Sequence, residues 1–245
     1  MAKIYFDIIT LFPQFFSGPL QTSLLAKSQE KGITKINLHD LRNFGIGKHK
    51  QVDDRPFGGG PGMVLRVDVL KKALDTTKKA SIQVEEETKP YVILLDPSGG
   101  KFDQGKAVRL SRKRRILFIC GHYEGVDERF KQYVDEEISI GDYILNGGEV
   151  AALVLIESVA RLIPGFLGKA ASTESESFAP SIQNGKNVRL LDYPSYTRPE
   201  NYEGEEVPKI LLSGNHKEIE QWRKSKAIEK TKKVRPDLIN IYTSK

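Results

Sequence analysis

Short runs of β-branched and aromatic residues alternate with amphipathic segments through the first two thirds of the chain. Two parallel strands need a crossover connection of a dozen or more residues, usually a helix, between them. The alternation therefore predicts an α/β fold with a mostly parallel sheet. We expect strands at Ile4–Leu11, Ile33–Leu38, Tyr91–Leu95, Ile116–Ile119 and Ile138–Ile140. We expect helices at Phe15–Lys31, Val67–Lys79, Gln104–Lys113, Asp127–Val134 and Val150–Ile163.

The composition changes after Gly168. The segment that follows is rich in Ser, Ala, Gly and Asn and has no sustained apolar period, which is typical of a linker. A turn-rich stretch comes next, and then a helical pattern from Lys217 to Lys233. The sequence therefore predicts a first domain over residues 1–167, a flexible linker over residues 168–190 and a small, mainly helical C-terminal domain over residues 191–245.

Charge and cysteine usage limit the classes of function. The formal charge is +6 and the pI about 9.2, which suits a polyanionic partner such as a nucleic acid. The single cysteine, Cys120, lies in an apolar run, as expected of a buried thiol in a reducing compartment, so we expect a cytoplasmic protein. The apolar run Val150–Ile156 is far shorter than the roughly 20 residues that span a bilayer, so no membrane partner is expected.

The stretch LLDPSGGKFDQGKA, residues 94–107, matches part of a phosphate-binding loop. Gly100, Gly105 and Lys106 fit the first seven positions of the pattern G-x-x-x-x-G-K-[ST]. Ala107 stands at the eighth position, where Ser or Thr would ligate Mg²⁺, so the motif is incomplete. A P-loop-like nucleotide hydrolase is therefore an alternative function. No G-x-G-x-x-G occurs, which disfavours a Rossmann cofactor site.

Four stretches combine glycine with polar residues: residues 53–63, 95–100, 120–129 and 139–149. The last three each follow a predicted strand. Because the carboxyl ends of parallel strands meet at one edge of a sheet, we expect these three loops to converge there. A tight turn accounts for one isolated glycine pair, but three such loops in register favour a ligand site in which backbone approaches the ligand closely.

These stretches, taken in order, resemble the bacterial tRNA (guanine-N1)-methyltransferase family, of the SPOUT class of knotted methyltransferases. The resemblance rests on long motifs that cover nearly the whole chain: FDIITLFP, VDDRPFGGGPGM, CGHYEGVDER, SIGDYILNGGE, ARLIPGFLGK, YPSYTRPENYEG and VPKILLSGNHKEI. It implies a deep trefoil knot in the sheet domain and S-adenosylmethionine as methyl donor, bound by three loops of the knot.

The resemblance also implies the residues of the donor site. They would be Leu94, Leu95, Asp96, Pro97, Gly99, Gly121, Tyr123, Glu124, Gly125, Ile140, Gly141, Tyr143, Leu145, Gly147 and Gly148. Ala151 stands where family members often have proline, which puts the far wall of this pocket in question. With the donor site placed upstream of it, Lys106 is expected to be a solvated residue in the first turns of the following helix.

Two roles at the acceptor follow from the chemistry. Methylation of guanine N1 requires loss of the N1 proton, while negative charge grows on O6 and needs a fixed cation or donor. The resemblance assigns the cation to Arg161 and the proton acceptor to Glu176, where the family usually has aspartate. A shift of two residues would give that role to Glu174 instead. Arg161 also lies four residues after Glu157, a spacing typical of a surface ion pair.

The resemblance implies further partners. The target would be the guanosine immediately 3′ of the anticodon, the C-terminal domain would bind the anticodon branch of tRNA, and the protein would be a homodimer with its active site between protomers. RNA contacts would come from His49, Asp53, Gly58, Gly59, Gly60, Pro61 and Gly62. The insert from Ile182 to Asn187 has no assigned role.

Metal dependence is a family trait, and the sequence offers no zinc site. Mg²⁺ is a possible cofactor, with Glu124 and Glu176 as conceivable ligands. His39, His122 and His216 have no metal-ligand spacing among themselves or with Cys120. A non-catalytic RNA-binding protein is the alternative function that is not enzymatic.

Overall fold

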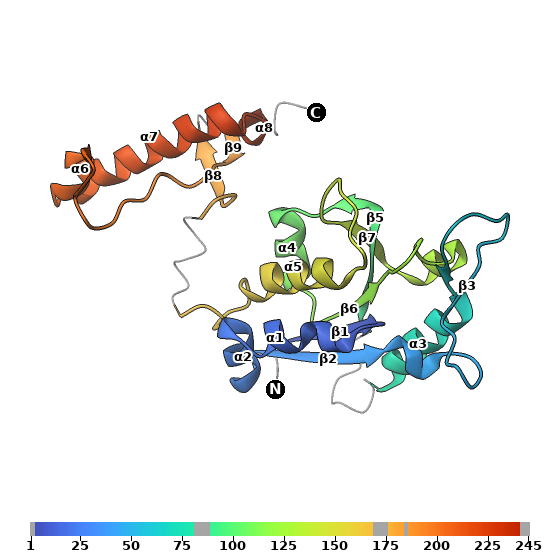
Figure 1. Ribbon diagram of the computed structural model, residues 1–245. Helices are drawn as coiled ribbons and strands as arrows, with labels where there is room; N and C mark the ends of the chain where they lie inside the picture. Colours follow the sequence, from blue (N-terminus) through green and yellow to red (C-terminus); the bar gives the residue numbers. More distant parts are fainter. Residues whose placement is uncertain (1–2, 81–88, 169–175, 184–185, 241–245) are drawn as a thin grey trace. The chain divides into compact units, whose positions relative to one another are not determined.

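The computed structural model describes residues 3–80, 89–168, 176–183 and 186–240. These residues belong to two compact units, Met1–Gly168 and Lys169–Lys245 (Figure 1). The first unit holds the main sheet and the three loops expected to bind a ligand.

A five-stranded parallel sheet forms the centre of the first unit, in the order β2-β1-β6-β5-β7. Its strands are β1 (Ile4–Thr10), β2 (Thr34–Asp40), β5 (Tyr91–Lys101), β6 (Arg115–Cys120) and β7 (Glu136–Ser139). All six residues of β6 are buried, as expected of a central strand covered on both faces. The prediction of an α/β fold with a mostly parallel sheet is confirmed.

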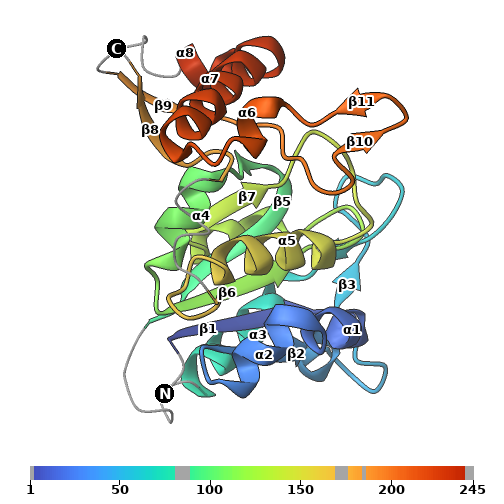
Figure 2. The ribbon, with the colours of Figure 1, turned by 90° about the vertical axis from the view of Figure 1, so that its left-hand side faces the viewer.

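Helices cover both faces of this sheet (Figure 2). On one face a buried apolar cluster joins the sheet to 3₁₀ helix η1 (Pro13–Phe16), α1 (Ser17–Leu20), α2 (Ser23–Glu30), α4 (Gln104–Ser111) and α5 (Glu149–Ala160). On the other face a second cluster joins it to 3₁₀ helices η2 (Leu41–Phe44) and η3 (Glu128–Tyr133) and to α3 (Val67–Ala80). Side chains of β6 alternate between the clusters, with Phe118 in the first and Leu117 in the second.

Two expected helices differ in the structure. The segment Phe15–Lys31 is broken between α1 and α2, where Thr22 is extended and Ser23 has a φ of 55°. A left-handed residue cannot continue a right-handed helix, so the chain starts a new one. The segment Asp127–Val134 forms only the short 3₁₀ helix η3, in which the Asp127 side chain accepts a hydrogen bond from the Arg129 amide.

The second unit contains the long helix α7 (His216–Val234), which includes the predicted Lys217–Lys233. The smaller elements are β8 (Pro180–Gln183), β9 (Lys186–Arg189), β10 (Asn201–Tyr202), β11 (Glu205–Glu206), α6 (Lys209–Leu212) and α8 (Asp237–Asn240). Strands β8 and β9 form an antiparallel hairpin within the segment predicted to be a linker, and their pairing spans the described part of the Ile182–Asn187 insert. Val188 is buried, and just beyond this segment the Leu191 amide donates to the Thr231 hydroxyl of α7 at 2.9 Å.

A buried carboxylate joins three strands of the sheet. Asp7 of β1 is 1% exposed and accepts hydrogen bonds from Arg115 Nε of β6 at 2.6 Å and from Asn37 Nδ2 of β2 at 3.1 Å. His39 Nε2 lies 2.9 Å from the same carboxylate. Burial by itself would raise the pKa of Asp7, but the hydrogen bonds with His39 and Arg115 and the Arg115 charge outweigh it and lower the pKa below its usual value.

Replacement of this carboxylate by an amide should destabilise the fold. A carboxylate whose pKa is lowered by folding stabilises the protein above its unfolded pKa, and that stabilisation is lost as the pH falls through the folded value. We expect Asp7→Asn to lower the free energy of unfolding by about 3 kcal/mol at pH 7. The difference from wild type should shrink below about pH 4. Urea unfolding at several pH values measures both effects, with the exposed Glu30→Gln as control; equal stability at pH 7 would contradict the prediction.

Candidate active site

An irregular part of β5 and the loops that follow β6 and β7 line one pocket of about 280 Å³. We call them the first loop (residues 95–100), the second loop (residues 121–127) and the third loop (residues 139–148). This volume is close to the lower end of the range of about 300–1,000 Å³ found for ligand pockets. The expected convergence of the three loops at one edge of the sheet is therefore present in the structure.

Most of the residues expected at the donor site line this pocket. They are Leu95, Asp96, Pro97, Gly121, Tyr123, Glu124, Gly125, Ile140, Gly141, Tyr143, Leu145, Gly147 and Gly148.

Two expected residues do not line the pocket. Leu94 is fully buried in the apolar cluster on the α3 face of the sheet. It precedes Leu95 in a strand, and successive side chains of a strand point to opposite faces. Gly99 packs instead against the backbone of β7, where an added β-carbon would lie 2.5 Å from the carbonyl carbon of Glu137.

The first loop arises from an irregularity in β5. Pairing with β7 shifts register between Leu95 and Gly100, so the intervening residues leave the ladder. Asp96 fixes this loop locally, because its Oδ1 accepts hydrogen bonds from the amide and the hydroxyl of Ser98. The strand therefore runs past its expected end at Leu95 and carries the first wall of the pocket within it.

The pocket also contains residues that the sequence analysis did not assign. They are His122, Ile138, Ser139, Ile144 and Asn146, while Ala151, named above for the far wall, also lines the pocket. His122 stands between two assigned residues of the motif CGHYEGVDER, and that position was the available signal. Its Nδ1 is buried and has no hydrogen-bond partner among the described residues. An unpaired buried polar atom costs about 1–3 kcal/mol of stability. Such an atom is typical of a site that binds a ligand or rearranges.

The second and third loops cross in close contact at two glycines. A β-carbon on Gly148 would lie 2.8 Å from the α-carbon of Cys120, and one on Gly147 would lie 2.5 Å from Nδ1 of His122. The Gly148 amide donates to the Gly121 carbonyl at 2.9 Å. At Gly148 the nearest atoms belong to the backbone, so a side chain there would force the two loops apart, whereas at Gly147 the nearest atoms are the ends of the Glu149 and His122 side chains.

A buried thiol lies beneath this crossing. Cys120 ends β6 and is 2% exposed. Burial raises the pKa of the thiol well above its usual value, and the nearby charge of Glu149 raises it further. Because the thiolate is the nucleophilic form of cysteine, Cys120 is a packing residue at neutral pH and not a nucleophile.

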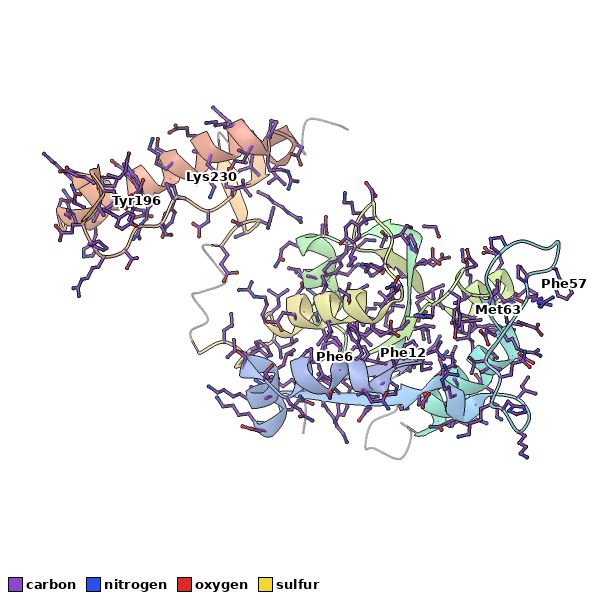
Figure 3. The ribbon with its side chains drawn as sticks, viewed as in Figure 1. Phe6, Phe12, Phe57, Met63, Tyr196 and Lys230 are labelled. Atoms are coloured by element: carbon purple, nitrogen blue, oxygen red, sulfur yellow. The ribbon has the colours of Figure 1, made fainter. Side chains whose placement is uncertain are left out.

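The glycine-rich stretch forms a hairpin loop that rests on the second loop. Residues 58–62 lie between β3 (Asp53–Asp54) and β4 (Val64–Leu65), and we call residues 53–65 the glycine hairpin. The Glu124 amide donates to the Met63 carbonyl at 3.0 Å, and the Leu65 amide donates to the Gly125 carbonyl at 3.0 Å. Phe57 is fully exposed at the outer part of this hairpin, with Met63 nearer the sheet (Figure 3).

The other expected RNA and catalytic residues have the following places. His49 is exposed in a turn before the glycine hairpin, and Asp53 belongs to β3. Arg161 directly follows the last residue of α5 and is partly exposed. Glu176 belongs to the second unit and is also partly exposed. Glu174 lies outside the described residues.

The partial phosphate-loop match does not form a phosphate cradle. Gly100 lies in β5, and Lys106 lies in the first turn of α4. The Lys106 amine donates to the Gly100 carbonyl at 2.8 Å and pairs with Glu136 at 3.2 Å. Lys106 is therefore not the solvated residue that was expected, because its amine satisfies the end of β5 and a neighbouring carboxylate.

The described residues contain neither a cluster of metal-binding side chains nor a membrane-spanning helix. Within residues 3–80, 89–168, 176–183 and 186–240, no group of three or more His, Cys, Asp and Glu side chains could hold a metal ion. In the same ranges, no helix is long and apolar enough to cross a membrane.

Comparison with known proteins identifies the family. The chain matches the family model for tRNA (guanine-1)-methyltransferase TrmD over residues 4–241. The chain belongs to this family. The resemblance stated from the sequence motifs is therefore confirmed.

Relatives in this family match almost the whole chain. A tRNA (guanine-N(1)-)-methyltransferase of Carboxydothermus hydrogenoformans is 51% identical over 236 residues, which cover 96% of this chain and 87% of that protein. The enzymes of the same name from Endomicrobium trichonymphae and Persephonella marina are 48% and 49% identical. They are covered over 98% and 87% of their lengths, and cover 95% and 96% of this chain.

Two glycines of the hairpin offer a matched test of its contact with the second loop. Gly59 and Gly62 both have a φ of +80°, but a β-carbon at Gly59 meets no atom within 4 Å. At Gly62 it would lie 2.4 Å from Oε1 and 2.5 Å from Cγ of Glu124. Alanine costs similar backbone strain at both positions, so only Gly62→Ala should also displace the Glu124 side chain.

We expect Gly62→Ala to speed amide hydrogen exchange in the second loop by about tenfold, because the hydrogen bonds that the Glu124 and Asp127 amides donate to the Met63 and Leu65 carbonyls open more often. Gly59→Ala should leave that exchange near wild type. Mass spectrometry of peptides that cover residues 121–127 measures the difference. Equal exchange in the two variants would show that the hairpin does not depend on this contact.

Proposed function

We propose that this protein transfers a methyl group from S-adenosylmethionine to N1 of the guanosine immediately 3′ of the anticodon in tRNA. The observation that carries the proposal is the convergence of three strand-end loops on one pocket, lined by family motifs. The proposal is supported by the names of relatives that are up to 51% identical over nearly the whole chain. The sheet domain is proposed to hold the trefoil knot of the SPOUT class.

The pocket has the character that a methyl donor of this kind requires. Leu95, Ile140 and Leu145 give it apolar walls, while the glycines of the second and third loops leave backbone groups open to close approach. The unpartnered Nδ1 of His122 adds a polar atom that is not satisfied within the described protein. S-adenosylmethionine would supply an electrophilic methyl group, and the loops would bind and orient it.

Arg161 and Glu176 are proposed to act on the guanine. Glu176 would accept the N1 proton, because the N1 lone pair becomes nucleophilic only when that proton leaves. Arg161 would donate to O6, where negative charge grows, and so stabilise the transition state more than the ground state. Its position at the end of α5, the helix that the third loop enters, keeps it on the same rigid element as the donor pocket.

A homodimer with its active site between protomers is proposed, as the family resemblance implies. Arg161 belongs to the first unit and Glu176 to the second. The outer side of α5 also exposes apolar side chains, with Val150 at 42% and Val154 at 39%. Beside them lies a groove of about 490 Å³, which Leu24 of α2 also lines. Exposed apolar surface of this kind is typical of an interface with another protein chain.

The surfaces proposed for tRNA lie in both units. In the first unit the glycine hairpin carries the exposed Phe57, which can stack on a base. In the second unit Arg223 of α7 lies 4.9 Å from the ring of Tyr193. Tyr196 and Trp222 form an aromatic pair in the same unit. Figure 3 shows Tyr196 and the basic Lys230 of α7 in this unit. Basic and aromatic side chains side by side suit the anticodon branch of tRNA.

Mg²⁺ dependence stays a prediction.

The reaction is tested with labelled S-adenosylmethionine, a tRNA transcript and wild-type protein. We expect label in the tRNA and 1-methylguanosine after nuclease digestion. Absence of transfer with ATP hydrolysis would indicate the nucleotide hydrolase instead, and tRNA binding without either activity would indicate an RNA-binding protein.

In the same assay, we expect Arg161→Ala to lower kcat by about 10²–10³-fold, the typical effect of removing one group that stabilises developing charge. Its affinity for the methyl donor, measured by calorimetry, should stay within about twofold of wild type, because Arg161 contacts the acceptor. Arg112→Ala, an exposed arginine at the end of α4, is the control. An unchanged rate in Arg161→Ala would refute its role.

Glu176→Gln should be far more damaging than Glu174→Gln, because an amide cannot accept the N1 proton. The reverse order would assign that role to Glu174. If the site lies between protomers, co-expressed Arg161→Ala and Glu176→Gln chains should form mixed dimers with one intact site. Activity should then recover to about a quarter of wild type. No recovery would place both groups on one protomer.

A further inference from the structure

Glu149 is a buried carboxylate with no role in the reaction described above. It is the first residue of α5 and is 5% exposed. Its Oε1 accepts a hydrogen bond from the Thr10 hydroxyl at 2.7 Å, and the Thr10 oxygen accepts one from the Phe12 amide at 2.9 Å. Because Thr10 ends β1, this chain of hydrogen bonds ties the edge of the sheet to the end of the third loop.

No lysine or arginine forms an ion pair with Glu149 in the described part of the chain. Its charge is stabilised by the Thr10 hydroxyl and by the amino end of α5, where the helix dipole favours an anion. A buried carboxylate with so few partners is expensive to maintain, since burial of a charge costs several kcal/mol. A neutral side chain would fill this place at lower cost if packing were its only role.

The second oxygen of Glu149 faces the second loop across Gly147. A β-carbon on Gly147 would lie 2.3 Å from Glu149 Oε2 and 2.5 Å from His122 Nδ1. Both polar atoms therefore border the same small space. His122 Nδ1 is the buried atom that lacks a partner, and its ring is held by Phe12 at a centroid distance of 5.1 Å. Phe12 is also the residue whose amide orients Thr10.

We propose that Glu149 is a positioning residue of the donor site that acts through His122. In the donor-bound protein, Oε2 of Glu149 accepts a hydrogen bond from Nδ1–H of His122 and so fixes the second loop against the third. This inference rests on the proposed methyl donor. Gly147 supplies the space, because without a side chain the two polar atoms can meet beside its α-carbon.

The close approach of His122 and Glu149 explains why donor binding would form the hydrogen bond between them. In the structure His122 Nδ1 has no partner among the described residues, although it lies beside a carboxylate. A ligand that contacts both loops brings them together, and a hydrogen bond to a charged group contributes more than a neutral one. The bond adds to donor affinity and does not touch the reacting methyl group, so Glu149 is a positioning residue and not a catalytic one.

The test separates donor affinity from the rate of methyl transfer. We expect Glu149→Gln to weaken binding of S-adenosylmethionine, measured by calorimetry, by about tenfold, because a neutral acceptor replaces a charged one. The KM for the donor should rise to match, and kcat at saturating donor should stay within about twofold. A loss of kcat with unchanged donor affinity would overturn the proposal.

A double-mutant cycle distinguishes positioning from packing. His122→Ala should lose donor affinity to the same extent as Glu149→Gln, and the double variant should lose no more than either alone, because both remove one bond. His122→Asn places an amide donor near the position of Nδ1 and should retain more affinity than His122→Ala. Additive losses, or equal losses in the Asn and Ala variants, would show that the two side chains act separately.

Two further measurements keep the outcome clear. Thr10→Val removes the donor to Oε1 but keeps the carboxylate and the shape of the side chain, so it serves if Glu149→Gln fails to fold. We expect it to weaken donor binding about threefold, and wild-type affinity would count against the proposal. Glu30→Gln, an exposed carboxylate of α2, is the control. If wild-type protein does not bind the donor, the proposed function fails. If it binds and Glu149→Gln binds equally, only this inference fails.

Discussion

The rest of the candidate site depends on the contact between two loops that leaves no room for a β-carbon. Gly148 brings the third loop against the backbone of Cys120 and Gly121, and Gly147 lies against the ring of His122. The parallel sheet makes this possible, because it delivers the ends of β5, β6 and β7 to the same edge. Helix α5 begins directly after this crossing and ends at Arg161, so one rigid element connects the loops to that side chain.

The second loop serves two sides of the proposed reaction. One side of it lines the pocket, while its backbone holds the glycine hairpin through Glu124 and Gly125. The hairpin is the segment proposed to meet RNA, and its outer glycines have open space around them. The proposed donor pocket and the proposed RNA surface therefore share one short stretch of backbone, with no further element between them.

The main sheet was predictable because apolar runs of strand length alternate with helical periods. The exceptions have local causes. A left-handed Ser23 breaks an otherwise helical pattern, and the hairpin β8–β9 is too short and polar to produce a strand signal. In the site, motif resemblance transferred whole stretches and so included Leu94, although the period of two in a strand sends Leu94 and Leu95 to opposite faces. The position of His122 within its motif indicates the pocket, but the unpaired state of its Nδ1 follows only from the folded structure.

The protonated state of Cys120 has a consequence for a protein that handles an alkylating ligand. A thiolate next to an activated methyl group would capture it, and the protein would consume its donor and modify itself. Burial of Cys120 and the neighbouring Glu149 charge raise the pKa of the thiol, so the sulfur stays protonated and weakly nucleophilic. The carboxylate that accepts a hydrogen bond from Thr10 thus also raises the pKa of a thiol that directly precedes the second loop.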